Sequence, residues 1–131
     1  MRQQVEYWLD LADYDRETAK ALLSSRRLLY VAFMCHQAME KALKGVYTAR
    51  CQAIPPKVHA LVKLAQMSAI WDEMTADQQQ WMIAVQPMNR ASRYPAEKAK
   101  LLAALTVPEC KRMIIEAVEM LQWIKQKLSS V

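Results

Sequence analysis

The chain has 131 residues, which suits one hydrophobic core because single domains typically contain about 100–200 residues. Hydrophobic residues make up 53% of it and charged residues 24%, a globular balance that excludes an intrinsically disordered chain. The net charge of +5 is concentrated in segments 26–63 and 88–112, and clustered Lys and Arg side chains attract phosphate without specifying a sequence. We therefore expect a single domain over residues 1–131 with an affinity for nucleotides or nucleic acid.

The residue types that are rare in the chain indicate its fold class. Gly45 is the one glycine, and no segment alternates β-branched or aromatic residues with polar ones. A sheet would need tight turns for which glycine is the usual residue, so the sequence predicts an all-α fold. No apolar run reaches the length of about 18 residues that spans a bilayer, and the start lacks a signal-peptide pattern. These features predict a cytoplasmic protein without a membrane partner.

Cysteine and histidine residues are too few and too dispersed to indicate a metal site. Cys35, Cys51 and Cys110 are odd in number and widely spaced, so neither a disulfide framework nor a paired metal motif is present in the pattern. His36 and His59 lack neighbouring carboxylates or thiols at ligand spacing. We expect no metal site and no cofactor, with His36 as a core residue and His59 as a residue that caps or packs against the third helix.

Two long helices are predicted in the first half of the chain, where apolar residues recur at three- and four-residue spacing. The first covers residues 2–24, and a short connection over residues 24–27 separates it from a second helix over residues 28–50. The second helix has one broad apolar face. This width indicates that the second helix packs at the centre of the domain.

The second half of the chain contains shorter periodic segments, separated by prolines that end helices. Thr75 is a suitable N-cap there, and Pro108 fits the first turn of a last helix. Residues 87–100 have little hydrophobic periodicity and predict an exposed loop. The predicted helices of this half cover residues 58–71, 75–86 and 107–128. Together the elements predict an up-and-down helical bundle of four to five helices.

A polar stripe lies opposite the apolar face of the second helix. Its members are Tyr30, Phe33, Gln37, Glu40, Lys41 and Lys44. Glu40 and Lys44 are one turn apart, in the favourable order for an ion pair. The stripe is either a solvated salt-bridge face or, since aromatic rings share the sector, a face that another helix partly covers, which would make its charges functional.

A second polar cluster falls in the predicted loop. Its members are Asn89, Arg90, Ser92, Arg93 and Tyr94, with Lys98 and Lys100 further along. Guanidinium groups bind phosphate through paired hydrogen bonds, and an aromatic ring stacks on a base. The cluster is therefore a candidate nucleotide or RNA site, and the alternative is an ordinary basic loop.

These segments together resemble a HEPN domain, in particular the subgroup associated with minimal nucleotidyltransferases, and the resemblance covers nearly the whole chain. The residues that match the first helix are Trp8, Ala12, Asp15, Ala19 and Leu22. Those that match the second are Tyr30, Ala32, Gln37, Ala38, Glu40, Lys41, Ala42, Leu43 and Lys44. His59 and residues 61–64 resemble the short helix that follows, and Arg93, Tyr94 and Pro95 resemble the subgroup's loop.

The resemblance implies a homodimer in which the loops of two copies form a shared cleft, together with a nucleotidyltransferase partner and a role in a toxin–antitoxin type system. Many members of the family are metal-independent ribonucleases that use an Arg and a His separated by four to six residues. After Arg90 the corresponding positions hold Pro95, Ala96 and Glu97, so this motif is absent. Imidazole is the side chain that exchanges protons most readily near neutral pH. No catalytic residue is therefore predicted.

The sequence favours a non-catalytic or weakly catalytic binding module. The residues expected to contact the nucleotide or RNA are Arg90, Arg93, Tyr94, Lys41, Lys44, Gln37 and Asn89. Two alternatives stay open: a ribonuclease toxin with a non-standard site, in which Arg90 steadies the phosphate and Tyr94 or a distant His carries the proton, and a structural dimerisation module without a ligand.

Overall fold

A computed structural model describes residues 1–90 and 93–129 of the chain. Within these residues the chain forms six α-helices and two short 3₁₀ helices, and no strand. They are α1 (Arg2–Ser24), α2 (Leu28–Cys51), α3 (Leu61–Met67), η1 (Trp71–Glu73), α4 (Ala76–Val85), η2 (Gln86–Asn89), α5 (Pro95–Ala104) and α6 (Val107–Ser129). The predicted all-α class is confirmed.

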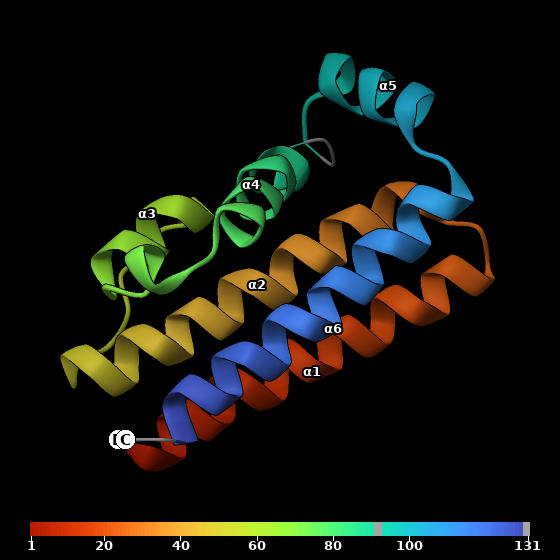
Figure 1. The fold of residues 1–131 in the computed structure, drawn as a ribbon. Helices are drawn as coiled ribbons and strands as arrows, with labels where there is room; N and C mark the ends of the chain where they lie inside the picture. Colours follow the sequence, from red (N-terminus) through yellow and green to blue (C-terminus); the bar gives the residue numbers. More distant parts are fainter. Residues whose placement is uncertain (91–92, 130–131) are drawn as a thin grey trace.

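Three long helices form the body of the molecule (Figure 1). Helices α1 and α2 run antiparallel, and α6 returns beside them with its end near the start of α1 (Figure 1). The short helices α3 and α4 pack on the other side of α2 and carry the chain back along it, while α5 lies beyond the far end of α4. Because α2 contacts α1, α3, α4, α5, α6 and η2, it is the central helix, as predicted.

The core forms where the apolar faces of the long helices meet those of α3 and α4. Its largest fully buried side chains are Met39, Leu43, Leu61, Leu64, Ile70, Met82, Leu121, Ile124, Val31, Val46 and Val85. Burying an aliphatic side chain of this size contributes about 1.5–3 kcal/mol. No helix in the described part of the chain is long and apolar enough to cross a membrane.

The boundaries of α1, α2 and α6 agree with the prediction to within a residue, because each carries a long apolar periodicity. The third helix is shorter than predicted: residues 57–60 form a non-helical connection, and α3 begins only at Leu61. Helix α4 begins after Thr75, whose hydroxyl accepts a hydrogen bond from the amide of Gln78, while the Gln78 side chain accepts one from the Thr75 amide. This capping box stabilises the helix start by about 1 kcal/mol.

The predicted loop over residues 87–100 is wrong in its second half, where Pro95 starts helix α5. No residue of α5 is buried, so the segment is exposed as expected, yet its Ala, Glu, Lys and Leu residues are intrinsically strong helix formers. The described residues therefore contain six α-helices, where four to five are predicted. Residues 86–90 and 93–94 form the compact connection that remains between α4 and α5, and α2 contacts η2 within it.

Candidate functional site

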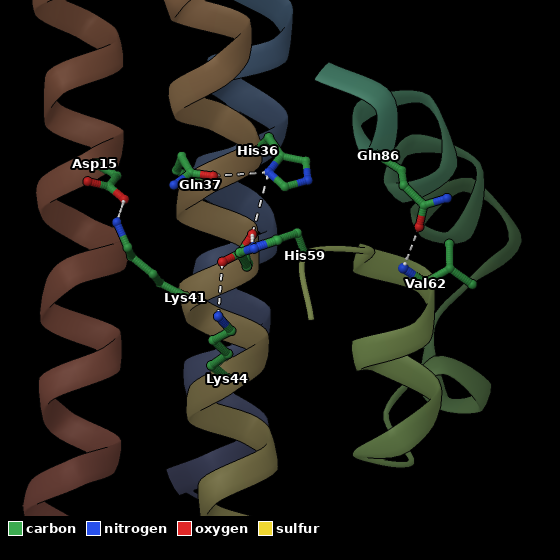
Figure 2. Close-up of polar contacts among 9 residues, drawn as sticks. Asp15, His36, Gln37, Lys41, Lys44, His59, Val62 and Gln86 are labelled. Atoms are coloured by element: carbon green, nitrogen blue, oxygen red, sulfur yellow. Dashed lines mark hydrogen bonds and ion pairs between the residues drawn. The ribbon is translucent and has the colours of Figure 1, made fainter. Parts of the chain in front are cut away.

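A cavity of about 520 Å³ lies where the connection after α2 meets the connection after α4. Its lining residues are His59, Ala60, Gln86, Pro87, Asn89, Arg90, Arg93 and Tyr94. The first two precede α3, and the others belong to η2 and the turn before α5. Gln86 joins the two segments, because its side-chain oxygen accepts a hydrogen bond of 2.9 Å from the Val62 amide at the start of α3 (Figure 2).

A tight turn brings Arg90, Arg93 and Tyr94 together. The amides of Arg93 and Tyr94 both donate to the Arg90 carbonyl oxygen, at 2.9 and 3.1 Å. The Arg90 guanidinium lies 4.9 Å from the centre of the Tyr94 ring, and its Nε donates to the Glu97 carboxylate at 3.3 Å. Arg93 is exposed and makes no ion pair with a described residue. The turn therefore holds two guanidinium groups and one aromatic ring at one edge of the cavity.

The polar stripe of α2 contains the buried carboxylate of Glu40, which contacts the cavity residue His59. The Glu40 side chain is only 6% exposed, and its two oxygens have different donors. Lys44 Nζ donates to Oε2 at 3.0 Å, and His59 Nδ1 lies 3.0 Å from Oε1. The solvated interpretation of the Glu40 and Lys44 pair is therefore wrong, because the connection before α3 covers it. Double pairing offsets the desolvation of this charge.

His36 lies one turn before Glu40 on α2 and is fully buried. Its Nδ1 is 3.3 Å from the Gln37 side-chain oxygen and 4.0 Å from Glu40 Oε1. Its Nε2 has no hydrogen-bond partner among the described residues. Burial lowers the pKa of His36, although the Glu40 carboxylate opposes the shift. The prediction of a core histidine is confirmed in position, and its neutral ring leaves one nitrogen unsatisfied.

The structure divides the seven predicted site residues into two groups. Asn89, Arg90, Arg93 and Tyr94 line the cavity together. The other three do not line it: they are Gln37, Lys41 and Lys44.

Their contacts explain the separation. Lys41 points away from the cavity toward α1, where its Nζ donates to the buried carboxylate of Asp15 at 2.5 Å (Figure 2). Lys44 is buried against Glu40, with its Nζ 5.7 Å from the centre of the Trp8 ring, so it does not extend an exposed positive surface as expected. Ser92 of the predicted loop cluster lies outside the described residues.

His59 is the titratable cavity residue that the sequence pattern does not assign to the site. It was expected to cap or pack against the third helix, but the N-cap of α3 is Ala60, without a side-chain hydrogen bond. The imidazole instead contacts Glu40, 19 positions earlier on α2. The available signal was its place in a proline-containing connection directly before an apolar helix, where a polar side chain is free to turn back over α2.

The arrangement suits the binding of an anionic group with an aromatic part. Two guanidinium groups and an imidazole supply hydrogen-bond donors, and the Tyr94 ring is half exposed. No set of three His, Cys, Asp or Glu side chains in residues 1–90 and 93–129 is arranged to hold a metal ion.

Comparisons with known proteins agree with the fold. The HEPN domain family model matches residues 5–127. The crystal structure of ST0689, an archaeal HEPN homologue, has 25% sequence identity and a TM-score of 0.73, and the match covers 95% of this chain and 98% of that chain. TT1696 from Thermus thermophilus has 19% identity and a TM-score of 0.78 with the same coverage, and it supports the fold alone. No curated protein matches the chain. Since the family model spans nearly the whole sequence, the chain belongs to the HEPN domain family.

Proposed function

We propose that the chain is a nucleotide- or RNA-binding module whose ligand occupies the cavity that His59 lines together with Arg90, Arg93 and Tyr94. The observation that carries the proposal is the convergence of His59, Arg90, Arg93 and Tyr94 on one cavity from two separate segments. Its volume of about 520 Å³ lies within the range of about 300–1,000 Å³ that is usual for small-molecule sites.

The charges around the cavity favour an anion. Arg93 makes no ion pair with a described residue. Arg90 contacts the Glu97 carboxylate through Nε, and the side chains of Arg90 and Glu97 are both about half exposed. Solvent-exposed guanidinium groups can replace their hydrogen bonds to water with charge-assisted hydrogen bonds to phosphate oxygens. The Tyr94 ring, half exposed beside them, offers a surface on which a base stacks.

The module acts in our proposal as a homodimer beside a nucleotidyltransferase partner, in a toxin–antitoxin type system. The subgroup resemblance of Arg93, Tyr94 and Pro95 supports the partner. Tyr7 and Tyr14 support a protein contact, since they lie seven residues apart on α1 with 59% and 72% of their surface exposed. Exposed aromatic residues are enriched at protein interfaces.

The test removes both guanidinium groups of the turn. In the variant Arg90→Ala with Arg93→Ala, we expect affinity for adenosine nucleotides and short RNA to fall by at least about tenfold, because each charge-assisted hydrogen bond contributes about 1.5–3 kcal/mol. Isothermal titration calorimetry at two salt concentrations measures the loss, and binding to the unmodified protein should weaken at high salt.

The matched control is Lys111→Ala with Arg112→Ala, which removes two exposed positive charges from α6, away from the cavity. This control should bind like the unmodified protein. Unchanged binding by a folded Arg90 and Arg93 double variant would overturn the proposal. Cleavage of the RNA that disappears in Arg90→Ala would instead favour the ribonuclease alternative, for which His59 in the cavity is the supporting observation.

A further inference from the structure

The chemistry of Glu40 determines which way the His59 ring is oriented. An ionised carboxylate only accepts hydrogen bonds, and Lys44 already donates to Glu40 Oε2. The contact of 3.0 Å between His59 Nδ1 and Glu40 Oε1 is therefore a hydrogen bond that the imidazole donates. His59 Nε2 is then the ring nitrogen left for a ligand, on a side chain that is 52% exposed and lines the cavity.

His59 faces charged or titratable groups from three parts of the chain. Helix α2 supplies Glu40, which offsets a positive charge on the imidazole, with Lys44 and His36 behind it. The segment between η2 and α5 supplies the rest of the cavity's charged and titratable groups, which are Arg90, Arg93 and Tyr94. Glu97 of α5 contacts Arg90.

His36 and His59 differ in what surrounds them. His36 is fully buried beside Gln37, and burial lowers its pKa, so that its ring is held neutral. His59 is half exposed and donates to a buried carboxylate (Figure 2). Of the two imidazoles, His59 is the one that lines the cavity and has a ring nitrogen available there.

We propose that the cavity binds a terminal phosphate group, a phosphomonoester, and that the protonated His59 imidazole, held by Glu40, donates to it through Nε2 beside Arg90 and Arg93. The inference rests on the proposed function and narrows its ligand class. A phosphomonoester carries about −1.5 to −2 charges at neutral pH and presents three strong acceptor oxygens, whereas an internal phosphodiester carries one charge and two free oxygens. The three cationic donors that line the cavity, His59, Arg90 and Arg93, therefore match a phosphomonoester.

The shape of the site supports the same ligand class. Sites for internal stretches of single-stranded RNA track the backbone over several nucleotides, about four or more in known folds. Here the donors surround a single cavity of about 520 Å³. A mononucleotide and the phosphorylated end of an RNA share the chemistry that such a cavity recognises.

The first experiment compares adenosine 5′-monophosphate with its methyl ester, which differs only in having a phosphodiester, by calorimetry on the full chain. We expect the monophosphate to bind about tenfold more tightly, because it has one more charge and one more acceptor for the cationic donors. In His59→Asn, whose amide replaces the Nδ1 donor to Glu40 but has no group in place of Nε2, the preference should fall below about threefold. Lys63→Ala, which removes an exposed charge from α3 outside the cavity, is the control and should keep the preference.

A second experiment uses sulfate, a dianion that only accepts hydrogen bonds. Because binding uses the Nε2 donor of His59, sulfate affinity should fall at least about threefold in His59→Asn, which has no group in its place. Lys63→Ala should bind sulfate like the unmodified protein. A 5′-phosphorylated oligoribonucleotide, compared with its unphosphorylated form, shows whether the phosphate comes from a free nucleotide or from an RNA end.

The outcomes separate the two proposals. Equal affinity for the monoester and the diester, or a sulfate affinity that His59→Asn leaves unchanged, would overturn the terminal-phosphate assignment while nucleotide binding stands. Absence of binding by any nucleotide or RNA would overturn the proposed function, and this inference with it.

Discussion

Glu40 and His36 lie one turn apart on α2, both almost fully buried, and the surrounding structure satisfies them differently. Glu40 has a donor for each oxygen, Lys44 from its own helix and His59 from the connection before α3. His36 has the Gln37 oxygen near Nδ1 and no partner for Nε2 among the described residues. An ion with two donors tolerates burial, whereas a buried imidazole whose pKa is lowered makes the fold sensitive to protonation.

The pH dependence of stability should reflect His36. Burial lowers its pKa from the ordinary value of 6.5, so below that pH the unfolded chain takes up a proton that the folded chain resists. The stabilisation is present in full above about pH 6.5 and is lost as the pH falls toward the lower folded pKa. We expect the free energy of unfolding to fall as the pH is lowered through this window.

Urea denaturation at several pH values measures this effect, with His36→Leu as the comparison because its side chain does not titrate. The difference between the unmodified protein and the variant isolates His36 from the carboxylates that titrate at lower pH. Parallel stability profiles for the two proteins would contradict the assignment.

At the scale of elements, α1 packs closely against α2 at Gly45, which has no side chain. A Cβ added at Gly45 would lie 3.4 Å from Trp8 Cβ and 3.5 Å from Leu9 Cδ2, which is ordinary van der Waals contact. Gly45 is buried in the middle of α2. The close approach of the helices therefore has room for a methyl group and for nothing larger.

Substitutions at Gly45 should consequently divide by size. Gly45→Ala should be neutral or raise the free energy of unfolding by up to about 1 kcal/mol, because alanine is the better helix former. Gly45→Leu should lower it by about 1–3 kcal/mol, since the larger side chain pushes α1 away from α2. Urea titration followed by circular dichroism measures both. Equal destabilisation by Ala and Leu would show that the helices are in closer contact than the structure indicates.

Helix α5 shows why the loop prediction failed at the scale of elements. The prediction relied on hydrophobic periodicity, and α5 buries no residue against the core. Its helix begins at Pro95, whose fixed φ suits a first helical position, and continues through residues that favour helix intrinsically. Intrinsic helix propensity was therefore sufficient to form α5 without hydrophobic periodicity. As a result, the connection that contains Arg90, Arg93 and Tyr94 is shorter than the predicted loop.

At the scale of the whole molecule, the three cysteine thiols differ in their exposure to solvent. Cys35 of α2 and Cys110 of α6 are buried, while Cys51 at the end of α2 is exposed. Burial raises the pKa of Cys35 to about 12 and also raises that of Cys110. Since the thiolate is the reactive form, the two buried cysteines are protected both sterically and chemically.

Labelling with a thiol reagent under native conditions should therefore show two classes of cysteine. Cys51 should react at once, and Cys35 and Cys110 should react together, at least about 10³-fold more slowly, because they become accessible on global unfolding. Mass spectrometry of quenched samples measures each rate. Faster labelling of Cys110 than of Cys35 would show that α6 detaches from α2 before the domain unfolds.

Much of the fold was predictable from the chain. The apolar periodicities of α1, α2 and α6 determine where these helices begin and end, and the width of the apolar face of α2 makes it central. The grouping of Arg90, Arg93 and Tyr94 was equally predictable, because residues within one turn remain neighbours in any fold that preserves it. These are local properties, and local spacing is what a sequence pattern states directly.

The tertiary structure alone decided which side of α2 is covered and what reaches the cavity. The spacing of Glu40 and Lys44 predicts an ion pair, but its burial depends on the connection that folds back over α2. The same fold brings His59 into contact with Glu40, 19 positions earlier, and into the lining of the cavity that Arg90 also lines. The pairing of residues distant in sequence follows from how the helices pack. The sequence by itself therefore determined the three long helices and one half of the candidate site, and packing supplied the other half.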